Sequence, residues 1–559
     1  MKVNEGQFGL SDEFTAEDLA CLDAGGLKIP HERVVMASRI VGMSNGAEDV
    51  ARWRAEDRSG KGAGGRPSLV SDHAALTILL LLALEHSSID YKRMAKLVAT
   101  RLTDESRELL GLPSSGASFD QWYYRLSRST KRFLKVLDGF AGPRWGRPTT
   151  EQLGEIMAGR DPAESDRNQK RLEAMVNALI HASYLMIPRD QRRHWNGASC
   201  VDGTFVSVMG KGTDKHRNFV GFEYDAGRYF REGDHGPDSG GVWKKSKWGY
   251  EATFVTMANV DLKGLAKFPL LITAMSFDKP ASRPAENALV AYTSMFENGL
   301  PTGLVAGDAA YGAGTIDSKY QLPLRAMGYQ LVMTYKGQYG IQEGFEGAIQ
   351  VDGWWYCPTL PKILIEASDD FNEQRIDLKT YYKRIEARRR YAATRKAMPG
   401  KNGQTRYSHP VDPDGEHLCD KGRVDAGKFC QQRTLVFPVE AGAKFAQELQ
   451  YMSPEWRKAF TGPRTTIEGQ NGYLKNQSMF QLDQAGRRRL RGRAANHLMT
   501  ALIVVAANIA KILTFLEDLK DDSKGLKNRA AKRERRRRRP YNWDGYTGRE
   551  RPEEPDPPG

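Results

Sequence analysis

The sequence predicts a mixed α/β protein with a helical N-terminal region and a long segment that interrupts its sheet. Three observations carry this prediction. Short apolar, β-rich runs are concentrated between residues 199 and 335, and helical patterns separate the later ones. Before them, helical patterns with capping residues follow one another through residues 67–190. After them, residues 340–452 lose this rhythm, and helix is expected again only from Thr465 onward.

The sheet-forming runs have a defined order along the chain. Residues 199–208, 250–260 and 268–277 are expected to form three consecutive strands, and residues 303–306 and 329–335 to form two more. The helical patterns before the last two strands cover residues 285–299 and 318–327. A three-stranded meander followed by two strands added through helical crossovers is the order of a ribonuclease H-like core. We therefore expect a mixed five-stranded sheet with helices, interrupted by an inserted subdomain.

Shifts in composition divide the chain into consecutive parts. They are an N-terminal region and linker (1–66), a helical, DNA-binding domain (67–190), the first part of the core (191–339), the inserted subdomain (340–455), the end of the core with a long helix (456–520) and a basic tail (521–559). Residues 523–539 contain ten Lys or Arg and one acid. A segment so rich in like charges is expected to be disordered and to add DNA affinity without reading sequence.

The overall composition narrows the class of protein. The chain has 559 residues, 40% of them hydrophobic, which suits a soluble protein of several domains. Its formal net charge of +14 indicates a polyanionic partner. Five cysteines do not make a disulfide scaffold. No signal peptide is expected, and the apolar runs at 76–84 and 498–513 fall short of the ~20 residues that span a membrane. We expect a cytoplasmic, nucleoid-associated protein.

Three carboxylates stand out by their positions. Asp202 lies inside an apolar strand, where an acid is costly unless it is paired or bound to a cation. Asp308 follows the fourth strand directly, and the first and fourth strands of the expected core are neighbours, so these two side chains should converge. Glu468 is expected on the first turn of a helix after the insertion. Carboxylates held together repel one another unless a cation neutralises them, and Mg²⁺ prefers such oxygen ligands.

Together these motifs resemble the DDE transposases of bacterial insertion sequences. Asp-Gly-Thr covers residues 202–204, and Gly-Asp-x-x-Tyr-Gly covers residues 307–312. An Arg-x3-Glu-x6-Lys motif follows at Arg464, Glu468 and Lys475. The resemblance is to the branch with a β-rich insertion before the glutamate, and it covers about residues 199–515. Thr461 stands where that branch has a tyrosine.

The resemblance implies a function and a set of partners. Asp202, Asp308 and Glu468 would be the catalytic residues and would hold two divalent ions, Mg²⁺ or alternatively Mn²⁺. The implied activity is cut-and-paste transposition: hydrolysis at the transposon ends, then attack by the freed 3′-hydroxyl, with no covalent protein–DNA intermediate. The implied partners are double-stranded DNA, as ends and target, and further copies of the chain in a dimeric or larger complex.

Two other functions remain open. One is another nuclease on the same core, such as a resolvase, although the long N-terminal region and the late Arg/Glu/Lys helix favour a transposase. The other is a domesticated transposase that only binds DNA, although the presence of all three acids favours an enzyme.

Two groups of cations are expected to contact DNA. Arg464 and Lys475 share a helix face with Glu468, where they suit phosphates, although an ordinary Arg–Glu pair is the alternative. The second group lies on the helical pattern at 119–137 and consists of Arg125, Arg128, Lys131 and Arg132. Helices suit the major groove, so this region is expected to bind the transposon ends. The alternative is a helical bundle that only braces the core.

The insertion contains further candidate residues. They are Cys357, His409, His417, Cys419 and Cys430. The spacing His417-x-Cys419, with Cys430 further on, allows a zinc site, but without a CxxC pair unligated residues are favoured. Trp354 and Trp355 are expected to pack within a strand rather than stack on a flipped base.

Overall fold

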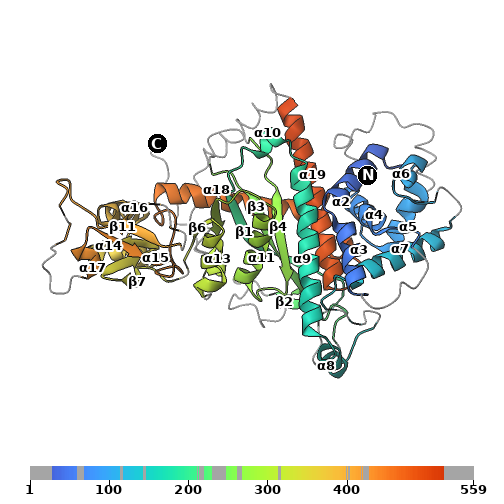
Figure 1. Ribbon diagram of the computed structural model, residues 1–559, viewed down its shortest axis with the longest axis horizontal. Coiled ribbons are helices and arrows are strands. Elements are labelled where there is room, and N and C mark those ends of the chain that lie inside the picture. Colours follow the sequence, from blue (N-terminus) through green and yellow to red (C-terminus); the bar gives the residue numbers. More distant parts are fainter. Residues whose placement is uncertain are drawn as a thin grey trace, which may run out of the picture.

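The computed structural model confirms a mixed α/β architecture with a helical N-terminal region (Figure 1). It describes residues 28–58, 68–113, 117–140, 142, 146–210, 212, 220–229, 247–260, 267–312, 316–335, 337–397, 400, 403–416, 418–419 and 427–520. The predictions for the linker at 59–67 and for the basic tail lie outside these residues.

The central sheet has five main strands, as predicted, and a short additional one. The strands are β1 (Ser199–Ser207), β2 (Gly227–Tyr229), β3 (Lys247–Met257), β4 (Ile272–Asp278), β5 (Leu304–Gly307) and β6 (Gln330–Met333). Along the main strands the order is β4-β3-β1-β5-β6, and β2 pairs with the start of β3. The pairs β4–β3 and β3–β1 are antiparallel, whereas β1–β5 and β5–β6 are parallel. Because β1 joins the two halves, residues at its centre lie in the middle of the sheet.

Helices cover both faces of this sheet. On one face, Val201, Val255 and Val305 pack with residues of α11 (Pro284–Glu297). On the other face, Cys200, Ala306 and Val332 pack with residues of α18 (Pro454–Leu474), such as Trp456 and Ile467. The alternation of strand side chains thus divides consecutive β1 residues between two cores. Short helices precede β6, namely α12 (Ala309–Gly312) and α13 (Gln321–Ala326).

Two asparagine side chains form hydrogen bonds with the backbone groups at the open edge of β4. The side-chain amide of Asn177, on α9 (Pro162–Leu185), bonds both the N–H and the carbonyl of Met275, at 2.8 and 3.0 Å. That of Asn508, on α19 (Arg493–Lys520), bonds the same two groups of Ile272, at 3.1 and 2.8 Å. Each amide replaces a neighbouring strand's peptide, so the edge is closed without a further strand.

The long helices α9 and α19 lie side by side between the sheet and the N-terminal helices (Figure 1). By length and apolar composition α19 could cross a membrane, but 83% of its apolar window is buried within the protein. Its neighbour α4 (Asp72–Leu84) has a continuous apolar sequence because it is enclosed by other helices on all sides.

The remaining N-terminal helices are α2 (His31–Met43), α3 (Gly46–Glu56), α5 (Tyr91–Lys96), α6 (Asp104–Leu109), α7 (Phe119–Lys135), α8 (Thr150–Ala158) and α10 (Arg189–Arg192), with a π-helical turn at Leu97–Arg101 after α5. Of these helices, α2, α3, α5 and α7 pack around α4. Sequence analysis left residues 28–58 without defined structure. They form α2 and α3, which pack on α4 and share its core.

The segment between β6 and α18 forms a separate lobe (Figure 1). Its two antiparallel sheets consist of β7 (Ile341–Phe345), β8 (Ala348–Val351) and β9 (Trp354–Tyr356), and of β10 (Thr394–Arg395), β11 (Thr405–Ser408) and β12 (Thr434–Phe437). Its helices are α14 (Lys362–Ile365), α15 (Ala367–Asn372), α16 (Leu378–Ala387) and α17 (Lys428–Gln431). A fully buried ion pair, Arg388 to Asp352 at 2.6 Å, lies in this inserted lobe.

Candidate active site

Asp202 and Asp308 occupy matching positions on neighbouring parallel strands. The register between β1 and β5 pairs Ser199 with Val305 and Cys200 with Ala306. The same offset places Asp308, the residue directly after β5, opposite Asp202. Paired strands lie about 4.8 Å apart, and residues at matching positions point to the same face. The predicted convergence of these two carboxylates therefore follows from the strand pairing.

Asp308 also begins a short helix. Its Oδ1 accepts a hydrogen bond from the Ala310 N–H at 2.9 Å, at the start of α12. One carboxylate oxygen thus caps the helix, and the other is available for a second role such as metal binding. Tyr311 of the same motif is buried, and burial, followed by the negative charges of Asp202 and Asp308, raises the pKa of its phenol well above the usual value.

Glu468 reaches the same region from α18. The Arg464 guanidinium contacts both acids, with Nη1 3.5 Å from Asp202 Oδ1 and Nη2 3.3 Å from Glu468 Oε1. The Arg464 side chain is 11% exposed and that of Glu468 is 57% exposed, so the arginine lies beneath the glutamate. The Arg–Glu pair that sequence analysis kept as an alternative does form, and it is part of the acidic cluster.

The expected start of this helix was wrong. Helix α18 begins at Pro454, capped by the Ser453 side chain, so Glu468 lies well inside it rather than on its first turn. A helix through Gly462 and Pro463 runs against the local pattern, because proline usually ends or kinks a helix. Here Pro463 is accommodated inside α18 and is buried.

Asn471 is a site residue that the sequence did not single out for this role. Its Nδ2 donates a hydrogen bond of 3.1 Å to Asp202 Oδ2. Asp202 is thus held by Asn471 on one oxygen and by Arg464 on the other. The signal was present in the helical spacing, because Asn471 lies three residues after Glu468 and seven after Arg464, on the same face.

The electrostatics of Asp202 indicate a site that suits a cation. Burial raises the pKa of the Asp202 carboxyl to about 6; the positive charge of Arg464 opposes this, and the negative charge of Asp308 adds to it. The Asp202 side chain is nevertheless 20% exposed, so it can be reached from solvent. A bound cation would remove the repulsion between Asp202 and Asp308 that favours the protonated form. The oxygen-rich donor set therefore fits a hard divalent ion.

A fourth acid, Glu251 on β3, lies on the other face of the sheet, because it pairs with Phe205 whereas Asp202 pairs with Phe254. Burial, and then the charges of Asp202, Asp278 and Asp308, raise the pKa of its carboxyl. Its Oε2 accepts a hydrogen bond from the Ala281 N–H at 3.3 Å. A Cβ at Gly203 would lie 3.0 Å from Glu251 Oε1, so the glycine after Asp202 makes room for this carboxylate. Glu251 was missed because only strand pairing brings it close.

The predicted DNA-contacting cations lie in two separate places. Lys475 caps the C-terminus of α18, on the helix that bears Arg464 and Glu468. The other four lie on α7, among the N-terminal helices, and do not join the acidic cluster. Arg128 and Lys131 are exposed, whereas the Arg125 guanidinium lies 5.2 Å from the centre of the Trp122 ring.

The fourth α7 cation, Arg132, has a partner within the N-terminal helices. Its Nη2 lies 3.6 Å from Asp72 Oδ1, at the start of α4, so part of its charge is used inside the fold.

The fold brings together some of the candidate residues of the inserted lobe. Cys357, Cys419 and Cys430 cluster with His409, while His417 lies outside the described residues. Trp355 packs on Phe437, with ring centres 5.0 Å apart, as expected for strand packing. Trp354 lines a cavity of about 990 Å³ between the lobe and the β6 edge of the sheet.

Comparison of the sequence with models of known protein families gives no match, and comparison with curated proteins gives none either.

Proposed function

We propose that this chain is a DNA transposase of the DDE type, which cuts DNA at transposon ends and joins those ends to a target. The observation that carries the proposal is the cluster around Asp202. Asp308 lies at the matching position of the neighbouring strand, and Arg464 links Asp202 to Glu468. Three acids from distant parts of the chain are thus linked, two by strand pairing and the third through Arg464.

The arrangement of the sheet supports the proposal. Antiparallel β4-β3-β1 followed by parallel β5 and β6 is the order and direction expected of a ribonuclease H-like core. The inserted lobe lies between β6 and the helix with Glu468, where the resembling branch of transposases has its insertion. These features support a ribonuclease H-like fold as part of the proposal.

Asp202, Asp308 and Glu468 would hold two Mg²⁺ ions, with Mn²⁺ as the alternative. When bound, such ions lower the pKa of an attacking hydroxyl and stabilise the leaving oxygen of an in-line phosphoryl displacement. Asn471 and Arg464 fix the orientation of the Asp202 carboxylate through its two oxygens. Of the three acids Glu468 is the most exposed. DNA would therefore approach the cluster from the side of Glu468.

Other side chains of α18 would bind the substrate backbone. Lys475, at the end of the helix, and Arg464 supply positive charge on either side of Glu468, which suits the phosphates that flank a scissile bond. Tyr311 is excluded as a nucleophile because it is buried and its raised pKa keeps the phenol protonated. This agrees with direct attack by water or a 3′-hydroxyl.

The test uses the full chain and a supercoiled plasmid carrying the coding region with its flanking DNA. Mg²⁺-dependent cleavage at the two ends, followed by joining to a second plasmid, is the expected result. Asp202→Asn, Asp308→Asn and Glu468→Gln should each abolish both steps and leave DNA binding intact. Glu297→Gln, an exposed acid at the end of α11, is the matched control and should behave as the wild type.

The same assay separates the three functions. Cleavage without joining would assign a nuclease, and binding without cleavage would assign a DNA-binding protein that has no catalytic role. Residual metal-dependent cleavage by Asp202→Asn would show that the acidic cluster is not the active site.

A further inference from the structure

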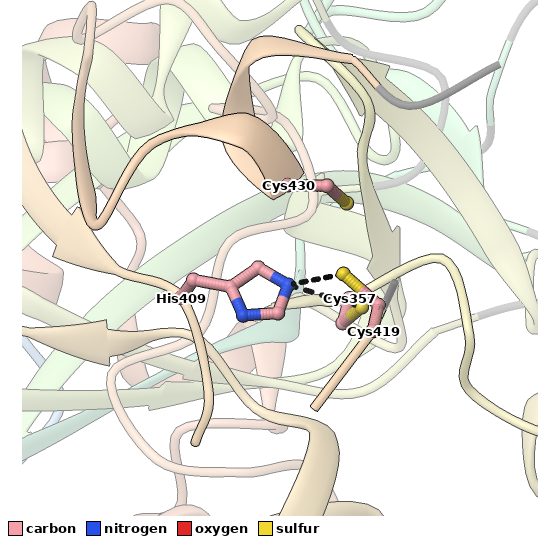
Figure 2. Close-up of side chains that lie close together, drawn as sticks. All are labelled: Cys357, His409, Cys419 and Cys430. Atoms are coloured by element: carbon pink, nitrogen blue, oxygen red, sulfur yellow. Dashed lines mark hydrogen bonds between the residues drawn. The ribbon is translucent and has the colours of Figure 1, made fainter. Parts of the chain in front are cut away.

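Four side chains with soft donor atoms meet inside the inserted lobe (Figure 2). Cys357 directly follows β9, His409 directly follows β11, Cys419 lies between β11 and α17, and Cys430 lies in α17. All four are buried, and their Sγ and ring nitrogen atoms all lie within 4.8 Å of one another. Residues up to 73 positions apart in sequence thus share one point in the lobe.

The histidine is oriented for metal binding. His409 Nδ1 lies 2.7 Å from the Pro410 carbonyl oxygen, so this nitrogen carries the proton and donates it. The Nε2 lone pair then faces the thiols, at 3.2 Å from Cys357 Sγ and 3.1 Å from Cys419 Sγ. A carbonyl that fixes the tautomer in this way is the usual support of a metal-bound histidine.

The spacing of the four atoms matches a tetrahedral site. With Zn–S near 2.3 Å and Zn–N near 2.0–2.1 Å, ligand atoms in such a site lie roughly 3.5–3.8 Å apart. Small shifts of the side chains would bring the four atoms to that separation. Thiolate and imidazole ligands select zinc over Mg²⁺ or Ca²⁺. The acidic cluster around Asp202 is the opposite case, because its donors are carboxylate oxygens.

A metal ion would add stability to a lobe that has only a small hydrophobic core. The hydrophobic core around these four residues contains few buried apolar side chains, and the three cysteines are among them. Cys357 extends the sheet β7-β8-β9, whereas His409 extends the sheet β10-β11-β12. A metal ion would therefore join two small sheets, neither of which has a large hydrophobic core of its own.

We propose that Cys357, His409, Cys419 and Cys430 bind one structural zinc ion that holds the two sheets of the inserted lobe together. The proposal does not depend on the proposed function, because none of these residues belongs to the acidic cluster. It also selects His409 over His417, which sequence spacing made the candidate.

The first measurement is the zinc content of the full chain purified without chelators. We expect one zinc ion per chain, and the cobalt-substituted protein should show the intense visible bands of tetrahedral cobalt with a thiolate charge-transfer band. His409→Gln should lose the bound ion. His417→Gln and Cys21→Ser are matched controls that should keep it.

A second variant covers the case in which His409→Gln does not fold. His409→Cys offers a complete set of four thiolates and should fold with one zinc ion bound. The proposal is overturned if the folded wild type contains no zinc, whether its cysteines are reduced or joined in a disulfide. It is also overturned if His417→Gln loses the ion or if folded His409→Gln retains it.

Discussion

At the scale of single residues, Arg464 determines the character of the acidic cluster. Its guanidinium has two Nη atoms, and each contacts a different acid. It lowers the pKa of Asp202, against the effect of burial, and so favours the ionised form that a metal requires. The same positive charge would oppose the binding of the proposed divalent cation, so Arg464 would have two opposing effects on it.

Replacing Arg464 by methionine separates these effects. At pH 8, above the pKa of Asp202, we expect Arg464→Met to bind Mn²⁺ about tenfold more tightly or more, because two unit charges about 4 Å apart interact by roughly 1–4 kcal/mol between bulk water and a protein surface. Cleavage should nevertheless slow by about two orders of magnitude or more, because a positive charge aimed at the phosphate is lost. Mn²⁺ titration followed by electron paramagnetic resonance, together with single-turnover cleavage, measures both quantities.

The control for this variant is Arg457→Met, on the same helix. Arg457 stacks on the Tyr382 ring, 3.8 Å from its centre, away from the acids. It should change neither quantity by more than a few-fold. Weaker Mn²⁺ binding by Arg464→Met would show instead that the arginine only supports the fold.

At the scale of elements, the edge of β4 is closed by side chains rather than by a strand. We expect Asn508→Leu to lower the free energy of unfolding by about 2–4 kcal/mol, because it leaves the N–H and carbonyl of Ile272 without a partner. The free energy of opening, measured by hydrogen exchange at the Ile272 amide, should fall by a similar amount. Asn298→Ala, whose side chain bonds only within its own helix end, should have little effect. Unchanged exchange at Ile272 would contradict the role of Asn508.

A buried histidine on α19 makes the protein sensitive to acid. His497 stacks on Phe277, and neither ring nitrogen has a hydrogen-bond partner among the described residues. Burial, and then the charge of Arg493, lower the pKa of His497 to about 3, while Asp278 acts in the opposite direction. The folded protein keeps this ring neutral, whereas the unfolded chain protonates it near its usual pKa. The resulting stability is present above about pH 6.5 and is lost as the pH falls below it.

His497→Phe removes this dependence. Between pH 7 and pH 5 the wild type should lose about 2 kcal/mol of unfolding free energy more than the variant does. Denaturant unfolding of both proteins at the two pH values measures the difference. His194→Gln, an exposed histidine, is the control and should lose stability as the wild type does. Equal losses in wild type and His497→Phe would show that the ring is protonated in the folded state.

At the scale of the whole molecule, the acidic cluster and the exposed cations of α7 lie on different parts of the protein (Figure 1). This separation fits a division between recognition and chemistry. Because α4 packs on α19 as well as on α7, an N-terminal fragment would expose apolar surface, and the full chain is needed to test DNA binding.

We expect Arg128→Ala combined with Lys131→Ala to weaken binding to the DNA that flanks the coding region. Losing two phosphate contacts should reduce the slope of log affinity against log salt by about 1.8. Arg132→Ala should instead reduce stability, because Arg132 pairs with Asp72 inside the fold. Binding titrations at several salt concentrations measure the slope.

The matched control removes equal charge from the inserted lobe, through Lys362→Ala combined with Lys379→Ala. Both lysines are exposed there. If this pair changes the slope and the α7 pair does not, recognition lies in the lobe.

The sequence predicted the main strands well, because strands depend on local pattern. Apolar runs of β-branched residues identified β1 and β3, and the order of elements implied that Asp202 and Asp308 are neighbours. Contacts that depend on tertiary packing were not predictable. His409 joins the cysteines through β11 rather than through sequence spacing, and Glu251 reaches Gly203 only through strand pairing.

Helix α18 connects the inserted lobe to the acidic cluster. Trp456, near its start, is buried beside Tyr451 and Gln447 at the base of the lobe, and Glu468 lies about 18 Å further along the axis, at 1.5 Å per residue. Pro463 lies between them, buried inside the continuous helix. A tilt of about 5° around Trp456 displaces Glu468 by roughly 1.5 Å, enough to change a reaction rate by about 10²-fold. If the chain has the proposed function, a change in how the lobe packs around Trp456 would therefore move the Glu468 carboxylate and alter the rate of cleavage.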